Sequence, residues 1–298
     1  MKRWMFNVLI FIFAAVFLVS AGVLGKYAWD SHVQKQREQQ IAQLVDRPQN
    51  QTRPTVPIQT KPVETTVPPE TTAPVATVPP EETQPEETEP AYMYDYVEVT
   101  TADGRVVPVL RDYAEVFRVN DHLVGWIQIP NTQIDYPVMQ TPDQTDYYLH
   151  RDFYREYSRH GTIYVRESCD VFAPDDNITI YGHRMKDGSM FFGLTAYLEE
   201  AYYRDNRYIY FDTLQEYHTY EILAVFITTA SKGEGFRYHV FEEAQSSEEF
   251  DEYIAKCKSL ALYDTGVTAQ YGDKLITLST CDYTLTNGRL VVVAKRIS

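Results

Sequence analysis

The chain has 298 residues, enough for one or two domains, and its 44% apolar and 14% aromatic content can supply a hydrophobic core. The formal net charge is −15 and no Lys/Arg-rich block follows the first residues, which argues against a nucleic-acid partner because phosphate binding needs clustered cations. Three cysteines, Cys169, Cys257 and Cys281, are too few for a disulfide framework. We favour free thiols at Cys169 and Cys257, and a bridge between them is the alternative.

The first predicted element is an apolar helix. No charged residue lies between Trp4 and Gly25, and about 20 such residues span a bilayer core. Lys2 and Arg3 precede this run, so residues 1–3 are expected in the cytoplasm, residues 4–25 in the membrane and the remaining chain outside the cell. The alternative is a cleaved signal peptide, but its apolar region would be shorter and would end at a clean cleavage site. We favour an uncleaved, single-pass anchor in the cell membrane.

A polar segment and a proline-rich segment follow the predicted anchor. Residues 26–47 are polar and tolerate a helix, which predicts a short juxtamembrane helix. Residues 48–91 hold eleven of the 16 prolines and seven glutamates, and no aromatic side chain. Such a composition cannot bury enough apolar surface to fold. We expect a disordered stalk that lifts the following domain off the membrane.

Residues 92–298 are predicted to form one globular domain that is mainly β with peripheral helices. Short β-branched or aromatic runs are bounded by Gly, Pro, Asn and Asp, which is typical of strands. The predicted strands cover residues 125–130, 161–167, 177–183, 207–213, 219–230, 274–281 and 289–296. The predicted helices cover residues 111–124, 189–206 with Ser189 as N-cap, and 246–264 with Ser246 or Ser247 as N-cap. Many short strands with few helices favour a closed or partly closed β-barrel.

Three residues at strand ends are candidates for catalysis. Cys281 ends the run "KLITLSTC", Arg289 opens the run "RLVVVAKR", and the Asn-Gly turn signal lies between them. If the two strands pair, Cys281 and Arg289 face each other at a barrel end, where a guanidinium favours a thiolate or binds an oxyanion. His183 follows Gly182 at the end of "NITIYGH" and could supply the histidine that a cysteine nucleophile needs. Taken singly, Cys281 and Arg289 fit a structural role better than a catalytic one, and the position of His183 fits both equally. The three together favour catalysis, because each lies at a strand end beside a turn or loop.

Other kinds of site lack their sequence signals. The chain contains no CxxC, HxxxH or HExxH motif, so a zinc site is not expected. Glycine-rich nucleotide-binding motifs are absent, and the acidic clusters lack the spacing of a calcium loop. We therefore expect no cofactor and no metal.

The segments around these three residues resemble the sortases, and within them class B. The resemblance rests on "TLSTC" followed by "RLVVVAKR", on the upstream "YGH", and on "NDHLVGWIQIPNTQIDYPVMQ", "YYLHRDF" and "HGTIYV". It extends from about Tyr113 to Ile297, and the helix Ser246–Tyr263 is similar to the insertion that distinguishes class B. The resemblance implies an eight-stranded sortase-type β-barrel and a cysteine transpeptidase. The loop between Cys281 and Arg289 is shorter than in some class B members, so motif preference is not transferred.

The resemblance also implies the roles of individual residues. Cys281 would attack a sorting motif in a secreted protein, His183 would protonate the leaving amine, and Arg289 would hold the substrate backbone or the oxyanion. Leu149 and Ser279 would line the motif groove, and Thr280 would help to orient the substrate. The partners would be a sorting-motif protein and an amine of a peptidoglycan precursor or of a pilin. The alternatives are a hydrolytic cysteine peptidase and a non-enzymatic binding module on a stalk.

Overall fold

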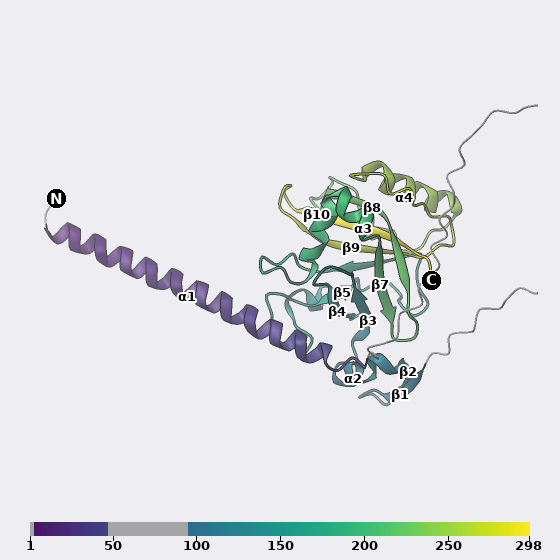
Figure 1. The fold of residues 1–298 in the computed structure, drawn as a ribbon, viewed down its shortest axis with the longest axis horizontal. Helices are drawn as coiled ribbons and strands as arrows, with labels where there is room; N and C mark the ends of the chain where they lie inside the picture. Colours follow the sequence, from purple (N-terminus) through teal and green to yellow (C-terminus); the bar gives the residue numbers. More distant parts are fainter. Residues whose placement is uncertain (1–2, 47–94) are drawn as a thin grey trace, which may run out of the picture.

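The structure is a computed structural model that describes residues 3–46 and 95–298, and its centre is a closed barrel of eight strands (Figure 1). The order around the barrel is β10-β8-β7-β3-β4-β5-β6-β9. Neighbouring strands are antiparallel, except that β4 pairs β5 and β6 pairs β9 in parallel. The strands are β3 (Leu123–Gln128), β4 (Asp135–Met139), β5 (Ile163–Val165), β6 (Asn177–Tyr181), β7 (Tyr208–Thr213), β8 (Thr219–Thr229), β9 (Leu275–Asp282) and β10 (Gly288–Arg296). The predicted mainly β, eight-stranded barrel is confirmed.

Seven of the eight barrel strands coincide with predicted strands, and β4 does not. The sequence of β4 is DYPVM, and its central Pro137 is a residue that normally argues against a strand because it cannot donate a ladder hydrogen bond. β4 nevertheless pairs β3, with Pro137 opposite Trp126. A second unpredicted feature is the hairpin of β1 (Tyr96–Thr100) and β2 (Val106–Leu110), which forms its own two-stranded sheet outside the barrel.

The peripheral helices are α2 (Arg111–Val119), α3 (Glu200–Asp205) and α4 (Ser247–Leu260), with 3₁₀ segments η1 (Tyr147–His150), η2 (Phe191–Leu198) and η3 (Tyr238–Val240). In α4 the hydroxyl of Ser246 accepts a hydrogen bond from the Glu249 N–H, which selects Ser246 over Ser247 as the N-cap. The prediction that Ser189 caps a helix is wrong. Met190 precedes η2 without any side-chain cap, because the Ser189 hydroxyl donates to Asp187 instead.

The barrel interior and its outer wall have separate apolar clusters. Leu278 of β9 and Leu290 of β10 belong to the interior cluster, which draws on all eight strands. Leu275 and Val291, on the same two strands, pack instead against α4 in a cluster outside the barrel. Successive residues of a strand point to opposite faces, so the two clusters define which face each residue of the β9–β10 hairpin occupies.

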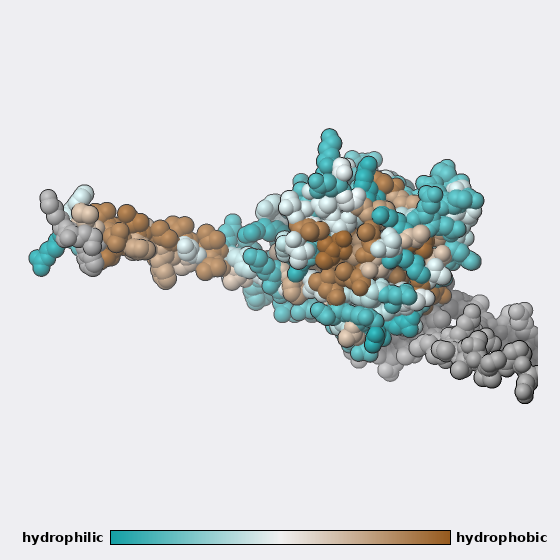
Figure 2. Space-filling model, turned by 90° about the horizontal axis from the view of Figure 1, so that it is seen from above, coloured by the Kyte–Doolittle hydropathy of each residue, from teal (hydrophilic) through white to brown (hydrophobic). Residues whose placement is uncertain are grey.

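The N-terminal helix α1 (Arg3–Ala42) is one continuous helix. It includes the predicted membrane anchor, residues 4–25, and most of the predicted juxtamembrane segment, residues 26–47. It is the one helix of the described chain that is long and apolar enough to cross a membrane. Its apolar first half extends away from the domain, as the brown surface in Figure 2 shows. Its second half lies against the domain, where Ile41 is buried in a cluster with Tyr113 and Val116 of α2.

The predicted stalk, residues 48–91, lies outside the described residues. The described chain ends before it at Asp46 and resumes after it at Asp95. On one flank, the backbone N–H of Asp46 donates to the Asp112 carbonyl at 3.0 Å. On the other flank, the Arg111 N–H donates to the Asp95 carbonyl at 2.8 Å. The two flanks therefore contact adjacent residues at the start of α2.

Candidate active site

Cys281 and Arg289 face each other across one antiparallel hairpin. β9 pairs β10 in a register that places Cys281 directly opposite Arg289. The turn is tight because Asn287 adopts a left-handed φ of 51° and Gly288 closely approaches the preceding strand. A Cβ at position 288 would lie 2.5 Å from the Asp282 carbonyl oxygen. The predicted juxtaposition of the thiol and the guanidinium is confirmed.

The two side chains point to the outer wall of the barrel, near its end. Leu278 and Leu290 point inward. Cys281 is three positions from Leu278 and Arg289 is one position from Leu290, so both side chains point to the opposite face. The two residues lie near one end of the barrel, as expected, with their side chains on its outer face. The site is a surface cleft on the wall formed by the hairpin, and it does not open into the barrel interior.

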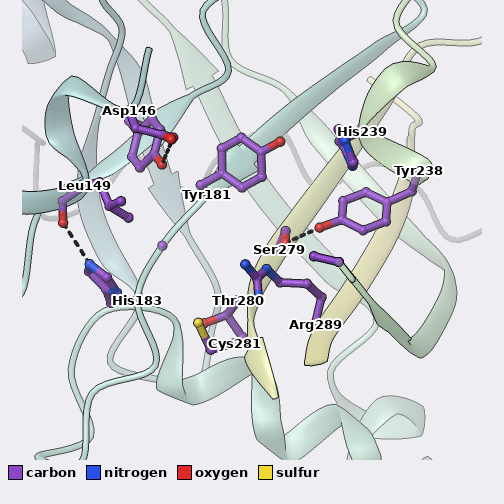
Figure 3. Close-up of a pocket in the computed structure, with 13 residues that line it drawn as sticks. Asp146, Leu149, Tyr181, His183, Tyr238, His239, Ser279, Thr280, Cys281 and Arg289 are labelled. Carbon is purple, nitrogen blue, oxygen red and sulfur yellow. Dashed lines mark hydrogen bonds between the residues drawn. The ribbon is translucent and has the colours of Figure 1, made fainter. Parts of the chain in front are cut away.

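All six residues that the sequence nominates line this one cleft, which has a volume of about 260 Å³ (Figure 3). They are Leu149, His183, Ser279, Thr280, Cys281 and Arg289. In Figure 3 the Sγ of Cys281 is directed toward the side on which His183 lies, and the Arg289 guanidinium lies on the other side of the cysteine. The cleft thus brings together a thiol, an imidazole and a guanidinium from three different strands or strand ends.

Glycine and a backbone contact fix the position of His183. Gly182 brings the chain so close to the barrel that a Cβ there would lie 2.5 Å from Ile163 and 2.7 Å from Phe191. The His183 ring nitrogen Nε2 lies 2.7 Å from the carbonyl oxygen of Leu149. A carbonyl oxygen can only accept, so Nε2 carries the proton of the neutral ring. Nδ1 is then the atom that can take up a further proton.

The surroundings of His183 favour its neutral form. Burial lowers the pKa of His183, and the neighbouring His150 and His160 lower it further, while the hydrogen bond to the Leu149 carbonyl raises it. The ring of His150 stacks on that of His183 with centroids 5.6 Å apart. At neutral pH the neutral imidazole is therefore favoured, in the same cleft as the half-buried Cys281 side chain.

Arg289, Ser279 and Thr280 differ in their hydrogen bonds and in their burial at the cleft. The Arg289 guanidinium donates to the carbonyl oxygens of Asn287 and Gly288 at 3.3 and 2.9 Å, so the hairpin turn holds it in place. The Ser279 hydroxyl shares a 2.6 Å hydrogen bond with the hydroxyl of Tyr238. Thr280 is 2% exposed, and its hydroxyl is buried with no hydrogen-bond partner among the described residues.

An ion pair connects the residues that follow His183 and Cys281 in the chain. The Arg184 guanidinium lies 3.3 Å from the carboxylate of Asp282, whose side chain is fully buried. Arg184 also lies over the ring of Tyr283, and the Tyr283 hydroxyl donates to the Arg184 carbonyl. We call the ion pair between Arg184 and Asp282 the brace. It joins the loop after β6, which carries His183, to the β9–β10 turn, which lies between Cys281 and Arg289.

Several lining residues were not predicted. Tyr181, Tyr238, His239, Asp146 and Tyr164 also contribute to the cleft. Tyr181 could have been found, because it lies two residues before His183 and therefore on the same side of the strand. Tyr238 and His239 come from η3, far from the motifs, and carry no local signal. Among the described residues no group of three His, Cys, Asp or Glu side chains is arranged to hold a metal ion.

The barrel is that of a known family. Residues 127–297 match the family model described as the sortase domain, and the chain therefore belongs to the sortase family. Among curated relatives it is 34% identical over 201 residues to sortase B of Listeria monocytogenes, covering 67% of this chain and 78% of that protein. It is 29% identical to sortase B of Staphylococcus aureus, covering 60% of this chain and 72% of that protein.

Solved structures of sortase B have the same fold. The crystal structure of sortase B from B. anthracis in complex with AAEK1 is 34% identical with a TM-score of 0.57, covering 68% of this chain and 90% of that one. A Staphylococcus aureus sortase B–substrate complex is 28% identical with a TM-score of 0.59, covering 64% of this chain and 86% of that one. As a sortase, the chain is a member of a family of cysteine transpeptidases.

Proposed function

We propose that the protein is a class B sortase, anchored in the cell membrane by residues 4–25 of α1. It would cleave a sorting motif in a secreted protein and join the acyl fragment to an amine of the cell wall or of a pilin. The observation that carries this proposal is the direct pairing of Cys281 with Arg289 in a cleft that also contains His183. Supporting it are the sortase B relatives and the apolar first half of α1.

The first half of the proposed reaction forms a thioester. The Cys281 thiol transfers its proton to Nδ1 of His183, and Sγ bonds to the carbonyl carbon of the motif. The peptide C–N bond breaks, and the leaving amine takes the proton from the imidazolium. Arg289 stabilises the oxyanion that forms between these steps. Burial and the nearby histidines disfavour the imidazolium, so the reactive ion pair is a small fraction of the enzyme.

The second half transfers the acyl group. An incoming amine attacks the thioester, the new C–N bond forms as the C–S bond breaks, and the proton released by the amine returns to the thiol through His183. Leu149 and Ser279 lie in the cleft where they can contact the motif. The Thr280 side chain is buried, so we assign its orienting role to its backbone.

The test is to incubate the full chain in detergent with a library of sorting-motif peptides, with and without an amine. A ligated product that depends on the amine, and that Cys281→Ala abolishes, is the expected result. Cleavage without ligation would favour the hydrolytic cysteine peptidase. A Cys281→Ala strain that retains all its wall-anchored proteins would favour a non-enzymatic binding module.

A further inference from the structure

The second half of α1 and the turn after it, residues 27–45, contact the two segments that precede and follow His183 in the site. One segment is the loop after His183, which contains Asp187. The other runs from Leu149, whose carbonyl accepts the His183 hydrogen bond, to His160. Each segment makes polar contacts with the helix, and each begins beside a residue that lines the cleft, His183 or Leu149.

Ser31 of α1 contacts the loop after His183. Its hydroxyl donates to the carboxylate of Asp187. Asp187 also accepts from the Nε2 of His160 at 2.8 Å, and His160 is 3% exposed. One carboxylate thus ties α1 to both segments, because Asp187 belongs to one of them and His160 to the other.

Arg37 of α1 supplies the charge that the second segment needs. Its guanidinium pairs with Asp152 and lies 2.6 Å from the carboxylate of Glu156. The Asp152 side chain is only 2% exposed, and its other carboxylate oxygen accepts from the backbone N–H groups of Tyr154 and Glu156. A buried carboxylate requires a counter-charge, and among the described residues Arg37 is its ion-pair partner. Without Arg37 of α1, the buried carboxylate of Asp152 would therefore lack its ion-pair partner.

Two further contacts come from the same face of α1. Gln34 is 8% exposed and accepts a hydrogen bond from the Ser158 hydroxyl at 3.1 Å. Ile41 is 3% exposed and completes a core cluster that includes Phe153. Ser31, Gln34, Arg37 and Ile41 are spaced by three or four residues, so they lie on one helix face.

We propose that residues 27–45 contribute to catalysis, and that Ser31 and Arg37 are positioning residues that hold His183 in place for Cys281. This inference rests on the proposed function, because it assigns His183 the catalytic proton transfers. The helix does not touch the reacting atoms. It acts through Asp187 and Asp152, which fix the two segments on either side of the imidazole.

The test compares Arg37→Gln and Ser31→Ala with Gln36→Ala and His32→Ala, in the full chain in detergent. Gln36 and His32 are adjacent in sequence to the contact residues but are exposed. With an active sorting peptide, Arg37→Gln is expected to lower kcat about tenfold with KM within twofold, and Ser31→Ala about threefold. Both control variants should match the wild type, and Arg37→Lys should restore most of the loss.

A second readout does not depend on a sorting peptide. The imidazole of His183 is titrated by NMR in protein labelled at histidine, with His183→Gln to assign the signal. Loosening the segments should expose the ring to water, so its pKa should rise toward the ordinary value in Arg37→Gln and Ser31→Ala only. If this shift occurs while the wild type shows no ligation, the proposed function fails and the positioning role survives.

The result that would overturn the inference is equally specific. If Arg37→Gln and Ser31→Ala lower the melting temperature but leave kcat and the His183 titration unchanged well below that temperature, α1 is a structural support only. Because Ser31→Ala leaves no buried charge unpaired, it keeps the test informative even if Arg37→Gln fails to fold.

Discussion

The brace between Arg184 and Asp282 is the residue-scale feature with the clearest energetic consequence. Each residue directly follows a nominated catalytic residue, and the Asp282 carboxylate is fully buried. Asp282 also accepts a hydrogen bond from the Thr284 N–H at 2.9 Å, so the same carboxylate shapes the turn before Arg289. A change on either side of the pair is therefore expected to affect both stability and catalysis.

Arg184→Gln should reduce the free energy of unfolding by about 3 kcal/mol, because it leaves a buried charge without its partner. Asp282→Asn added to Arg184→Gln should recover part of this loss, since the unpaired charge is then removed. Urea unfolding of the four proteins of this double-mutant cycle measures the coupling. Additive losses would show that the two side chains do not interact.

At the scale of elements, α4 offers a comparison between two adjacent serines. Ser246→Ala removes the hydrogen bond to the Glu249 N–H and should cost about 1 kcal/mol. For a domain of this size, about 1 kcal/mol corresponds to a fall of roughly 2–4 °C in melting temperature. Ser247→Ala, one residue into the helix, should change the melting temperature by less than half as much. Equal losses would contradict the assignment of the cap.

The elements also show what the sequence could and could not predict. The β9–β10 hairpin was predictable because its signals are local: two apolar runs and an Asn-Gly turn. The strand β4 was missed because Pro137 opposes a strand locally, whereas its pairing with β3 depends on tertiary context. Tyr238 reaches Ser279 from 41 positions away, and no local pattern encodes such a contact. The catalytic roles of His183, Cys281 and Arg289 stay predictions that rest on the family.

At the scale of the whole molecule, the second half of α1 is docked on the domain, whereas the sequence of residues 26–47 predicts only a short juxtamembrane helix. The partners of Ser31 and Arg37 lie more than a hundred residues away, so the amphipathic spacing alone could not reveal them. The same interface contains Glu38, which faces Asp187 and has Gln34 and Lys35 as its neighbours on the helix. Tyr136 of β4 also interacts with Glu38 across this interface.

Glu38 should make docking of α1 depend on pH. Burial, reinforced by the negative charge of Asp187, raises the pKa of Glu38 from its ordinary 4.5 to about 7, although Gln34 and Lys35 lower it. Because docking favours the protonated form, the docked helix loses stability as the pH rises from about 4.5 to about 7 and no further above that. Glu38→Gln should therefore raise the free energy of unfolding at pH 7.5, by at most roughly 3 kcal/mol, and leave it unchanged at pH 4. Thermal unfolding at the two pH values measures the difference as a higher melting temperature at pH 7.5 only. An equal increase at both pH values would contradict this origin.

The flanks of residues 47–94, Asp46 and Asp95, are both held at the start of α2 by backbone hydrogen bonds to adjacent residues. In topological terms the proline-rich segment is an insertion between two points that the fold already brings together. The entropy of closing such a loop grows only with the logarithm of its length, about 0.6 kcal/mol for each doubling. Insertions and deletions in this segment are therefore nearly neutral for folding. In the membrane-anchored protein that we propose, the height of the cleft above the bilayer would be set by the rise of α1, at about 1.5 Å per residue, and would not depend on the length of the proline-rich segment.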